Sequence, residues 1–156
     1  MIILSKLADY GVIVAAHLAA TPQRQMTAAA LAEEARLPRA TVAKVLKALA
    51  HGGIVAGARG ASGGYRLARP STAISVADVV AAIDGVISVT QCTNHGSQAS
   101  DAPSCTRSTF CPTRPHWHRI NHAVGTALAA VSLADMVPPP SIFAPPAAAS
   151  REIVSS

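Results

Sequence analysis

The feature that most restricts the fold of this chain is a helix pattern that leads directly into a glycine-rich hairpin. Pro38 suits the first turn of a helix, because the N–H that proline lacks would have no partner there. The apolar stripe of this helix recurs at i, i+3, i+4 and i+7: Val42, Val45, Leu46 and Leu49. Gly52 follows, in the region where helices commonly end. Two strand-like runs, 54–56 and 65–68, flank the glycines of residues 57–64, which predicts a two-stranded hairpin, here called the wing.

Two further helix patterns precede this unit. Residues 6–20 place apolar side chains on one face, and Thr21 followed by Pro22 ends that pattern. Thr27 is a favourable N-cap for a second helix over residues 28–35. Two short helices, a tight turn and a third helix with a polar, basic face are typical of a helix-turn-helix. The expected fold is therefore mostly α with a small β-hairpin, a winged helix-turn-helix.

The polar side chains outside the apolar stripe predict where such a fold would contact DNA. On the third helix these are Arg39, Thr41, Lys44 and Lys47. Arg59 lies at the tip of the wing and would enter a minor groove, whose negative potential attracts arginine. The alternative for Arg59 is a solvated turn residue. The tip lacks the Gly-Lys-Ser/Thr ending of a phosphate-binding loop, so a nucleotide site is not predicted.

The distribution of charge supports a polyanionic partner. Residues 1–70 contain nine Lys and Arg and three Asp and Glu, a net charge of +6. Residues 71–156 contain four basic and five acidic side chains, a net charge of −1. The positive charge therefore belongs to the half that carries the predicted helix-turn-helix, as expected for a nucleic-acid-binding domain. A basic face that is merely solvated is the alternative.

The second half of the chain predicts two more helices and a tail. Ser75 and Asp78 form a capping-box-like start for a helix that ends before Gly85. After Pro115, apolar residues recur in steps of three and four: Trp117, Ile120, Val124, Ala127, Val131 and Ala134. This stripe favours a seam between two copies of the same helix, with an ordinary core-facing helix as the alternative. We expect residues 1–73 to bind DNA, residues 74–136 to hold a linker helix, the cysteines and a dimerisation helix, and the proline-rich residues 137–156 to be disordered.

All three cysteines of the protein lie between these two helices, spaced C-x12-C-x5-C at Cys92, Cys105 and Cys111. Residues 92–111 are here called the cysteine segment. Structural zinc sites usually have closely spaced cysteine pairs, which this segment lacks. An iron–sulfur cluster tolerates wider spacing and can supply the folding energy of an irregular loop. No activating base marks a catalytic thiol, so an enzyme is not predicted.

Four stretches carry a resemblance to a known family. Residues 4–10 (LSKLADY), 37–47 (LPRATVAKVLK) and 59–67 (RGASGGYRL) resemble the IscR/NsrR family of bacterial winged-helix regulators. Residues 111–121 (CPTRPHWHRIN) resemble its subgroup that regulates the SUF iron–sulfur assembly operon. The resemblance implies a homodimer that binds a palindromic operator in double-stranded DNA. It also implies one iron–sulfur cluster per subunit, held by Cys92, Cys105 and Cys111.

The chain departs from the IscR pattern at the fourth ligand. IscR-type members have a histidine three positions after the third cysteine, and that position here is Arg114, which has no lone pair to offer a metal. Asp9 matches the position at which NsrR-type members use an aspartate from the other subunit. We therefore expect Asp9 as the fourth ligand, with His95 and His116 as alternatives. A 2Fe–2S cluster is preferred to a 4Fe–4S cluster.

The sequence thus predicts a transcriptional regulator that senses an iron–sulfur cluster and controls iron–sulfur assembly genes. A thiol- or zinc-dependent repressor on the same scaffold is the alternative, and an iron–sulfur electron carrier is less favoured because it would need no DNA-binding half. Residues 1–4 are too short for a signal peptide, and no run reaches the roughly 18 apolar residues of a membrane span. We expect a cytoplasmic protein that does not associate with membranes, and in that compartment its thiols would stay reduced.

Overall fold

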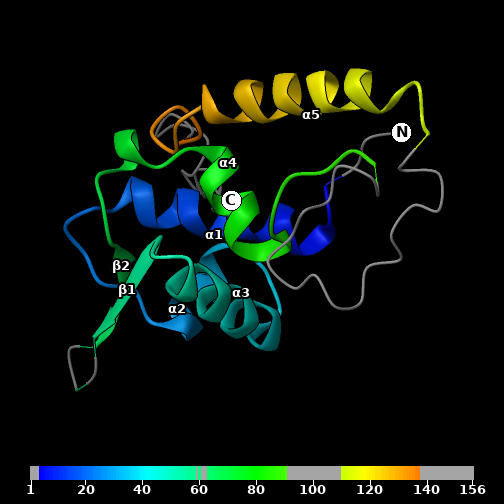
Figure 1. Cartoon of the computed structure of the whole chain (residues 1–156). Helices are drawn as coiled ribbons and strands as arrows, with labels where there is room; N and C mark the ends of the chain where they lie inside the picture. Colours follow the sequence, from blue (N-terminus) through cyan, green and yellow to red (C-terminus); the bar gives the residue numbers. More distant parts are fainter. Residues whose placement is uncertain (1–3, 59, 61–62, 91–109, 138–156) are drawn as a thin grey trace, which may run out of the picture.

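The computed structural model describes residues 4–58, 60, 63–90 and 110–137 (Figure 1). In chain order the elements are α1 (Lys6–Ala20), α2 (Ala28–Glu34), α3 (Arg39–His51), β1 (Val55–Ala58), β2 (Gly64–Leu67), a short 3-10 helix (Ser71–Ala73), α4 (Val76–Asp84) and α5 (Arg114–Ala129). Strands β1 and β2 pair antiparallel, with Val55 opposite Leu67 and Ala58 opposite Gly64. The predicted fold class, mostly α with a small hairpin, is confirmed.

Short polar side chains begin three of the helices. The Ser5 hydroxyl accepts a hydrogen bond from the Ala8 N–H (3.0 Å), and the Thr27 hydroxyl accepts one from the Ala30 N–H (3.1 Å). At α4 the capping box is complete, because Ser75 and Asp78 each accept from the other's backbone N–H. Pro38 occupies the N-cap of α3, one residue before the first turn that the sequence suggested.

The core is built from the stripes that the sequence predicted. The α3 residues Val42, Val45, Leu46 and Leu49 are fully buried, together with Val14 of α1, Leu31 of α2 and Val79 of α4. Two glycines let α4 pack closely against α1 and the end of α3. A methyl group at Gly11 of α1 would collide with Ile83, and one at Gly52 after α3 would lie 2.5 Å from the Ala82 Cβ. These contacts fix α4 against both α1 and α3.

The wing is fastened to the helical part by Met26, just before α2. The Met26 N–H donates to the Tyr65 carbonyl (3.0 Å), and the Tyr65 N–H donates to the Met26 carbonyl (2.8 Å). Gly64 makes this possible, since a side chain there would lie 2.9 Å from the Met26 backbone. The base of the wing therefore has a fixed orientation relative to α2 and α3.

Helix α5 lies along the outside of the molecule, on the far side of α4 from α3 (Figure 1). None of its residues is fully buried within the chain. The helix ends at Ala129, so Val131 and Ala134 do not extend its apolar stripe as the sequence predicted. Instead the chain turns inward at Leu133, which is fully buried. No helix among the described residues has the length and apolar character needed to span a membrane.

The turn after α5 is closed by Ser132 and Asp135. The Asp135 carboxylate accepts hydrogen bonds from the Ser132 hydroxyl (2.6 Å) and the Ser132 N–H (2.9 Å). These hydrogen bonds lower the pKa of Asp135 below its ordinary value, because they stabilise the ionised form. The prediction that residues 137–156 are disordered falls, except for Val137, outside the described residues.

Candidate nucleic-acid interface and cysteine segment

The predicted DNA-contacting residues of α3 differ in how far they are exposed. Arg39, Lys44 and Lys47 are exposed, whereas Thr41 is half-buried at the edge of the apolar stripe. Arg39 lies 3.4 Å from the Glu33 carboxylate of α2, and both side chains are more than 70% exposed. Such an exposed ion pair is worth at most about 1 kcal/mol, so Arg39 can leave Glu33 for a phosphate or a base.

Two small residues on this face were not singled out from the sequence. Ala40 and Ala43 are exposed between the basic side chains of α3. Alanine leaves room for DNA to approach the helix backbone, and its methyl group can contact the methyl group of thymine. The signal that could have identified them is their position opposite the apolar stripe. Together the exposed residues give α3 a face of small and basic side chains.

The wing adds a second basic area. Arg59 lies outside the described residues, while its neighbour Gly60 has a φ of 112°, which favours glycine. Arg66 of β2, opposite Ala56, is exposed and lines a hollow of about 380 Å³ together with Arg69. Arg69 is held in place, because its guanidinium donates to the Ala73 carbonyl (3.2 Å). Arg66 was not singled out from the sequence, although alternation along β2 could have placed it outward.

Of the predicted cluster ligands, the structure describes Cys111 and Asp9, while Cys92 and Cys105 lie outside the described residues. Cys111 is half-buried three residues before α5, and its Sγ lies 3.2 Å from the Thr113 Oγ1. The amino-terminal end of a helix favours negative charge, which suits a thiolate. Asp9 is exposed in the first turn of α1.

Of the two alternative histidine ligands, the structure describes one. His95 lies outside the described residues, and His116 is exposed in the first turn of α5. Within the described part of the chain, no three His, Cys, Asp or Glu side chains come close enough to hold a metal ion. The donor set expected for an iron–sulfur cluster is therefore represented there by one thiol at the start of α5 and one exposed carboxylate on α1.

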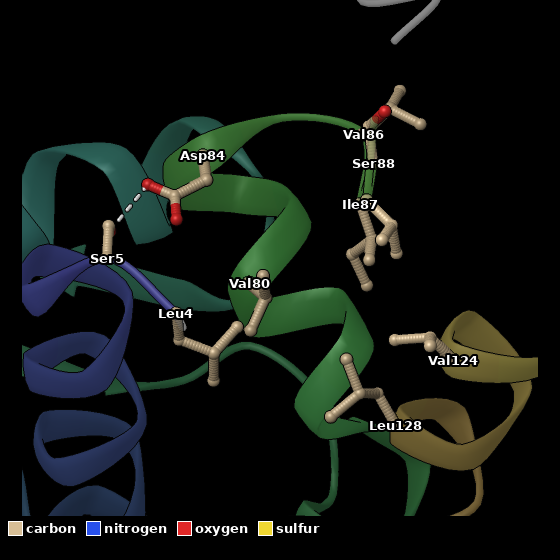
Figure 2. A pocket seen from close by; sticks show the side chains of 10 residues that line it. Leu4, Ser5, Val80, Asp84, Val86, Ile87, Ser88, Val124 and Leu128 are labelled. Atoms are coloured by element: carbon tan, nitrogen blue, oxygen red, sulfur yellow. Dashed lines mark hydrogen bonds between the residues drawn. The ribbon is translucent and has the colours of Figure 1, made fainter. Parts of the chain in front are cut away.

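The residues that lead into the cysteine segment line a pocket of about 320 Å³ (Figure 2). Val86, Ile87 and Ser88 line one side of the pocket, Val80 projects from α4 beside Leu4, and Val124 and Leu128 line it from α5. At the rim the Ser5 hydroxyl donates to the Asp84 carboxylate (2.8 Å), which joins the start of α1 to the end of α4. On α5 the Asn121 side chain is hydrogen-bonded to the backbone at Ile87 and Val89.

Comparison with known proteins agrees with this architecture. Residues 4–139 match a family model, Rrf2, described as an iron-dependent transcriptional regulator. The chain belongs to the Rrf2 family. Its match covers the helix-turn-helix, the wing, the cysteine segment and α5. The predicted resemblance to IscR-type regulators is thereby confirmed, and the chain is a transcriptional regulator of the Rrf2 type.

Individual Rrf2 proteins support the same conclusion. The HTH-type transcriptional regulator IscR of Vibrio cholerae is 28% identical over 115 residues, which are 74% of this chain and 62% of that protein. The structure of IscR from T. potens has a TM-score of 0.64 and 26% identity, and the match covers 86% of this chain and 85% of that one. The structure of CymR, the global cysteine regulator of B. subtilis, has a TM-score of 0.66 and 24% identity. That match covers 88% of this chain and 97% of that one. The likeness to CymR is a likeness of fold.

Proposed function

We propose that this Rrf2 regulator binds a palindromic operator in double-stranded DNA as a homodimer and senses an iron–sulfur cluster. The observation that carries the proposal is the arrangement of two faces on one rigid core. Helix α3 presents exposed Lys44 and Lys47 next to the wing, and α5 lies on the other side of α4 with no fully buried residue. One face thus suits DNA, and the other suits a second copy of the chain.

The proposed DNA contacts come from two elements, helix α3 and the wing. Arg39, Thr41 and Lys44 of α3 contact base edges or nearby phosphates in the major groove, and Lys47 contacts the phosphate backbone. Arg59 at the wing tip enters the minor groove. Two heads in a homodimer would read half-sites about one helical turn apart, so their separation decides how well both fit at once.

The cluster is held by Cys92, Cys105 and Cys111, with Asp9 of the partner subunit as the fourth ligand. Support comes from Cys111, whose thiol precedes the first turn of α5, and from the exposed position of Asp9 on α1. Thiolates are the donors that iron–sulfur clusters use, and the cluster would supply redox and oxygen sensitivity. Because a carboxylate is a harder donor than a thiolate, the fourth bond would be comparatively labile. A 2Fe–2S cluster is proposed, and the controlled genes are those of iron–sulfur assembly.

The cluster would act on DNA binding through α5. Cys111 lies three residues before this helix, and the helix is the proposed dimer seam, so binding of a cluster at the cysteines would change the angle between two protomers. A small change in that angle alters how the two α3 helices match their half-sites. A thiol- or zinc-dependent repressor on the same scaffold is the second candidate, favoured by Arg114 at the position where IscR-type members have a ligand.

The test is purification without oxygen, followed by a visible absorption spectrum and iron analysis. An iron–sulfur protein is brown, whereas a zinc or thiol regulator is colourless. Operators are selected from a random DNA pool with the cluster-loaded protein and with the triple Cys→Ala variant. Equal affinity and footprint of both forms on every selected sequence would exclude cluster sensing. Arg59→Ala with unchanged affinity at several salt concentrations would exclude the proposed role of the wing.

A further inference from the structure

Arg66 lies on the outer face of the wing, the face that does not pack on the helices. Its neighbours in β2, Tyr65 and Leu67, pack against the core, so the alternation of a strand directs Arg66 to the opposite side. Arg66 is exposed there, and across the ladder it is paired with Ala56, whose side chain is too small to cover it. The guanidinium is therefore accessible from outside the molecule.

The hollow of about 380 Å³ beside Arg66 is here called the wing hollow. Its polar side chains are those of Arg66, Arg69 and the half-buried Ser71, and every residue that lines it belongs to the described part of the chain. Small or apolar residues such as Pro22 and Ala56 form the rest of its wall, and no carboxylate is among the lining residues. Two cations and no anion on these walls suit a negatively charged group.

The two arginines of the wing hollow differ in what they already contact. Arg69 donates to the Ala73 carbonyl (3.2 Å) and lies 3.8 Å from the Asp78 carboxylate. Arg66 forms no ion pair and no side-chain hydrogen bond with any residue that the structure describes. Arg66 can therefore bind an external anion without breaking an internal contact, while Arg69 adds positive potential from a fixed position.

Duplex DNA presents such anions where the wing is proposed to bind. The two phosphate backbones form the edges of the minor groove, so a hairpin laid against that groove has phosphates beside its faces. An arginine guanidinium can donate two parallel hydrogen bonds to one phosphate. The wing projects from the helical part of the molecule, which leaves its outer face open to a partner (Figure 1).

We propose that the wing hollow is a phosphate site, in which Arg66 binds one backbone phosphate of the operator. This inference rests on the proposed DNA-binding function and adds a contact that belongs neither to α3 nor to the tip of the wing. A phosphate contact carries no base information, so Arg66 positions the wing on the duplex and does not select its sequence. Free inorganic phosphate has the same chemistry and is the other possible source of the anion.

Three variants separate a phosphate contact from a general effect of charge. Arg66→Gln removes the cation, and Arg66→Lys keeps the charge but loses the two-pronged geometry. Arg119→Gln removes the same charge from an exposed position of α5, on the far side of α4 from α3. Affinity for an operator selected from the random pool is measured from about 50 to about 200 mM salt. Melting temperatures check that each variant is folded.

The expected result is a slope of log affinity against log salt that falls by about 1 in Arg66→Gln. Its loss of affinity relative to wild type should then be roughly 3-fold larger at the lower salt concentration. Arg66→Lys should restore the slope, and Arg119→Gln should leave it unchanged. A wild-type slope in Arg66→Gln would overturn the inference. An equal fall in Arg66→Lys or Arg119→Gln would also overturn it.

A second measurement identifies the phosphate. Each phosphate of the operator is replaced in turn by an uncharged methylphosphonate, which weakens the wild-type complex wherever a phosphate is contacted. Arg66→Gln should become insensitive at one position in each half-site and keep the other sensitivities. If both proteins are sensitive at the same positions, Arg66 contacts no phosphate and the inference fails although DNA binding stands. A wild type that binds no duplex would overturn the proposed function, and the inference with it.

Inorganic phosphate tests the other source of the anion. Titrated into DNA-free protein, it should shift the NMR signal of the Arg66 Nε–H only weakly and without saturation, because a single phosphate lacks the other contacts of the duplex. Saturable binding of inorganic phosphate, together with wild-type DNA affinity in Arg66→Gln, would assign the wing hollow to a free anion and overturn its assignment to DNA.

Discussion

The backbone N–H of Leu133 donates to the carbonyl of Ile74 at 2.8 Å, and both side chains are fully buried. A second bond runs from the Val76 N–H to the Val131 carbonyl (2.9 Å). These two bonds join the end of α5 to the start of α4, and α4 packs on α1 and α3. The end of α5 is therefore anchored to the same core that holds α3.

Replacing Leu133 tests this connection. Leu133→Ala should lower the free energy of unfolding by about 2–5 kcal/mol, because a fully buried leucine is lost and a cavity remains. Urea denaturation measures the change. Met136→Ala is the matched control, since Met136 is 40% exposed three residues later and should cost less than about 1 kcal/mol. Similar losses in the two variants would mean that Leu133 does not anchor α5.

Gly11 and Gly125 are both helical glycines with opposite surroundings. A methyl group at Gly11 would collide with Ile83, so Gly11→Ala should destabilise the protein by about 1–3 kcal/mol. At Gly125 of α5 no described residue lies within 4 Å of the added methyl, and Gly125→Ala should stabilise the helix by roughly 0.5–1 kcal/mol. Melting temperatures measured at one protein concentration give the comparison. A stabilised Gly11→Ala would show that α1 and α4 are not in close contact.

The ionised carboxylate of Asp135 stabilises the folded protein by an amount that depends on pH. Its pKa is lowered by the hydrogen bonds from Ser132, so the ionised form is favoured in the folded protein. The resulting stabilisation is present above the ordinary carboxyl pKa of about 4 and is lost as the pH falls through the lowered value. Asp135→Asn should therefore melt below wild type at pH 7, and the difference should shrink as the pH falls below the ordinary carboxyl pKa and through the lowered one. A difference that stays constant with pH would assign the effect to packing.

Local patterns explain why much of the fold could be predicted. The limits of α1, the cap at Thr27 and the stripe of Val42, Val45, Leu46 and Leu49 depend on neighbouring residues, and the structure agrees with all of them. The extent of α5 could not be predicted in this way. Steps of three and four continue through Val131 and Ala134. Burial of Leu133 in the core, however, stabilises the fold more than an extension of the outer helix would.

The candidate site was predictable only where it depends on residue type. Thiols and basic side chains can be identified without a structure, so the cysteines, Lys44 and Lys47 were named as candidates. Asn121 could not be assigned a role, because its partners are backbone groups 32 and 34 residues earlier in the chain. Thr41 was placed on the outer face, and the structure has it half-buried because it borders the apolar stripe.

Lys44 should contribute to DNA binding through phosphate charge. Lys44→Ala should weaken binding to a random-sequence duplex and reduce the slope of log affinity against log salt by about 1. Arg119→Ala is the matched control, because Arg119 is an exposed cation on α5, on the far side of α4 from α3. Equal changes in both slopes would indicate a general effect of net charge and would contradict the assignment of α3 to DNA.

The fourth ligand can be tested by mixing subunits. Asp9→Ala alone should shorten the lifetime of the cluster in air, while His95→Ala and His116→Ala should not. The free energy of unfolding should fall by no more than about 1 kcal/mol, since exposed Asp9 contributes only to the charge balance of the first turn of α1.

A heterodimer of Asp9→Ala with the triple Cys→Ala chain has one complete site if Asp9 acts across the subunits. That heterodimer should hold a cluster with wild-type lifetime, because thiols from one chain meet the carboxylate of the other. Rapid loss from the heterodimer would place the ligand within the same subunit, and a bleached histidine variant beside a stable Asp9→Ala would give the role to histidine.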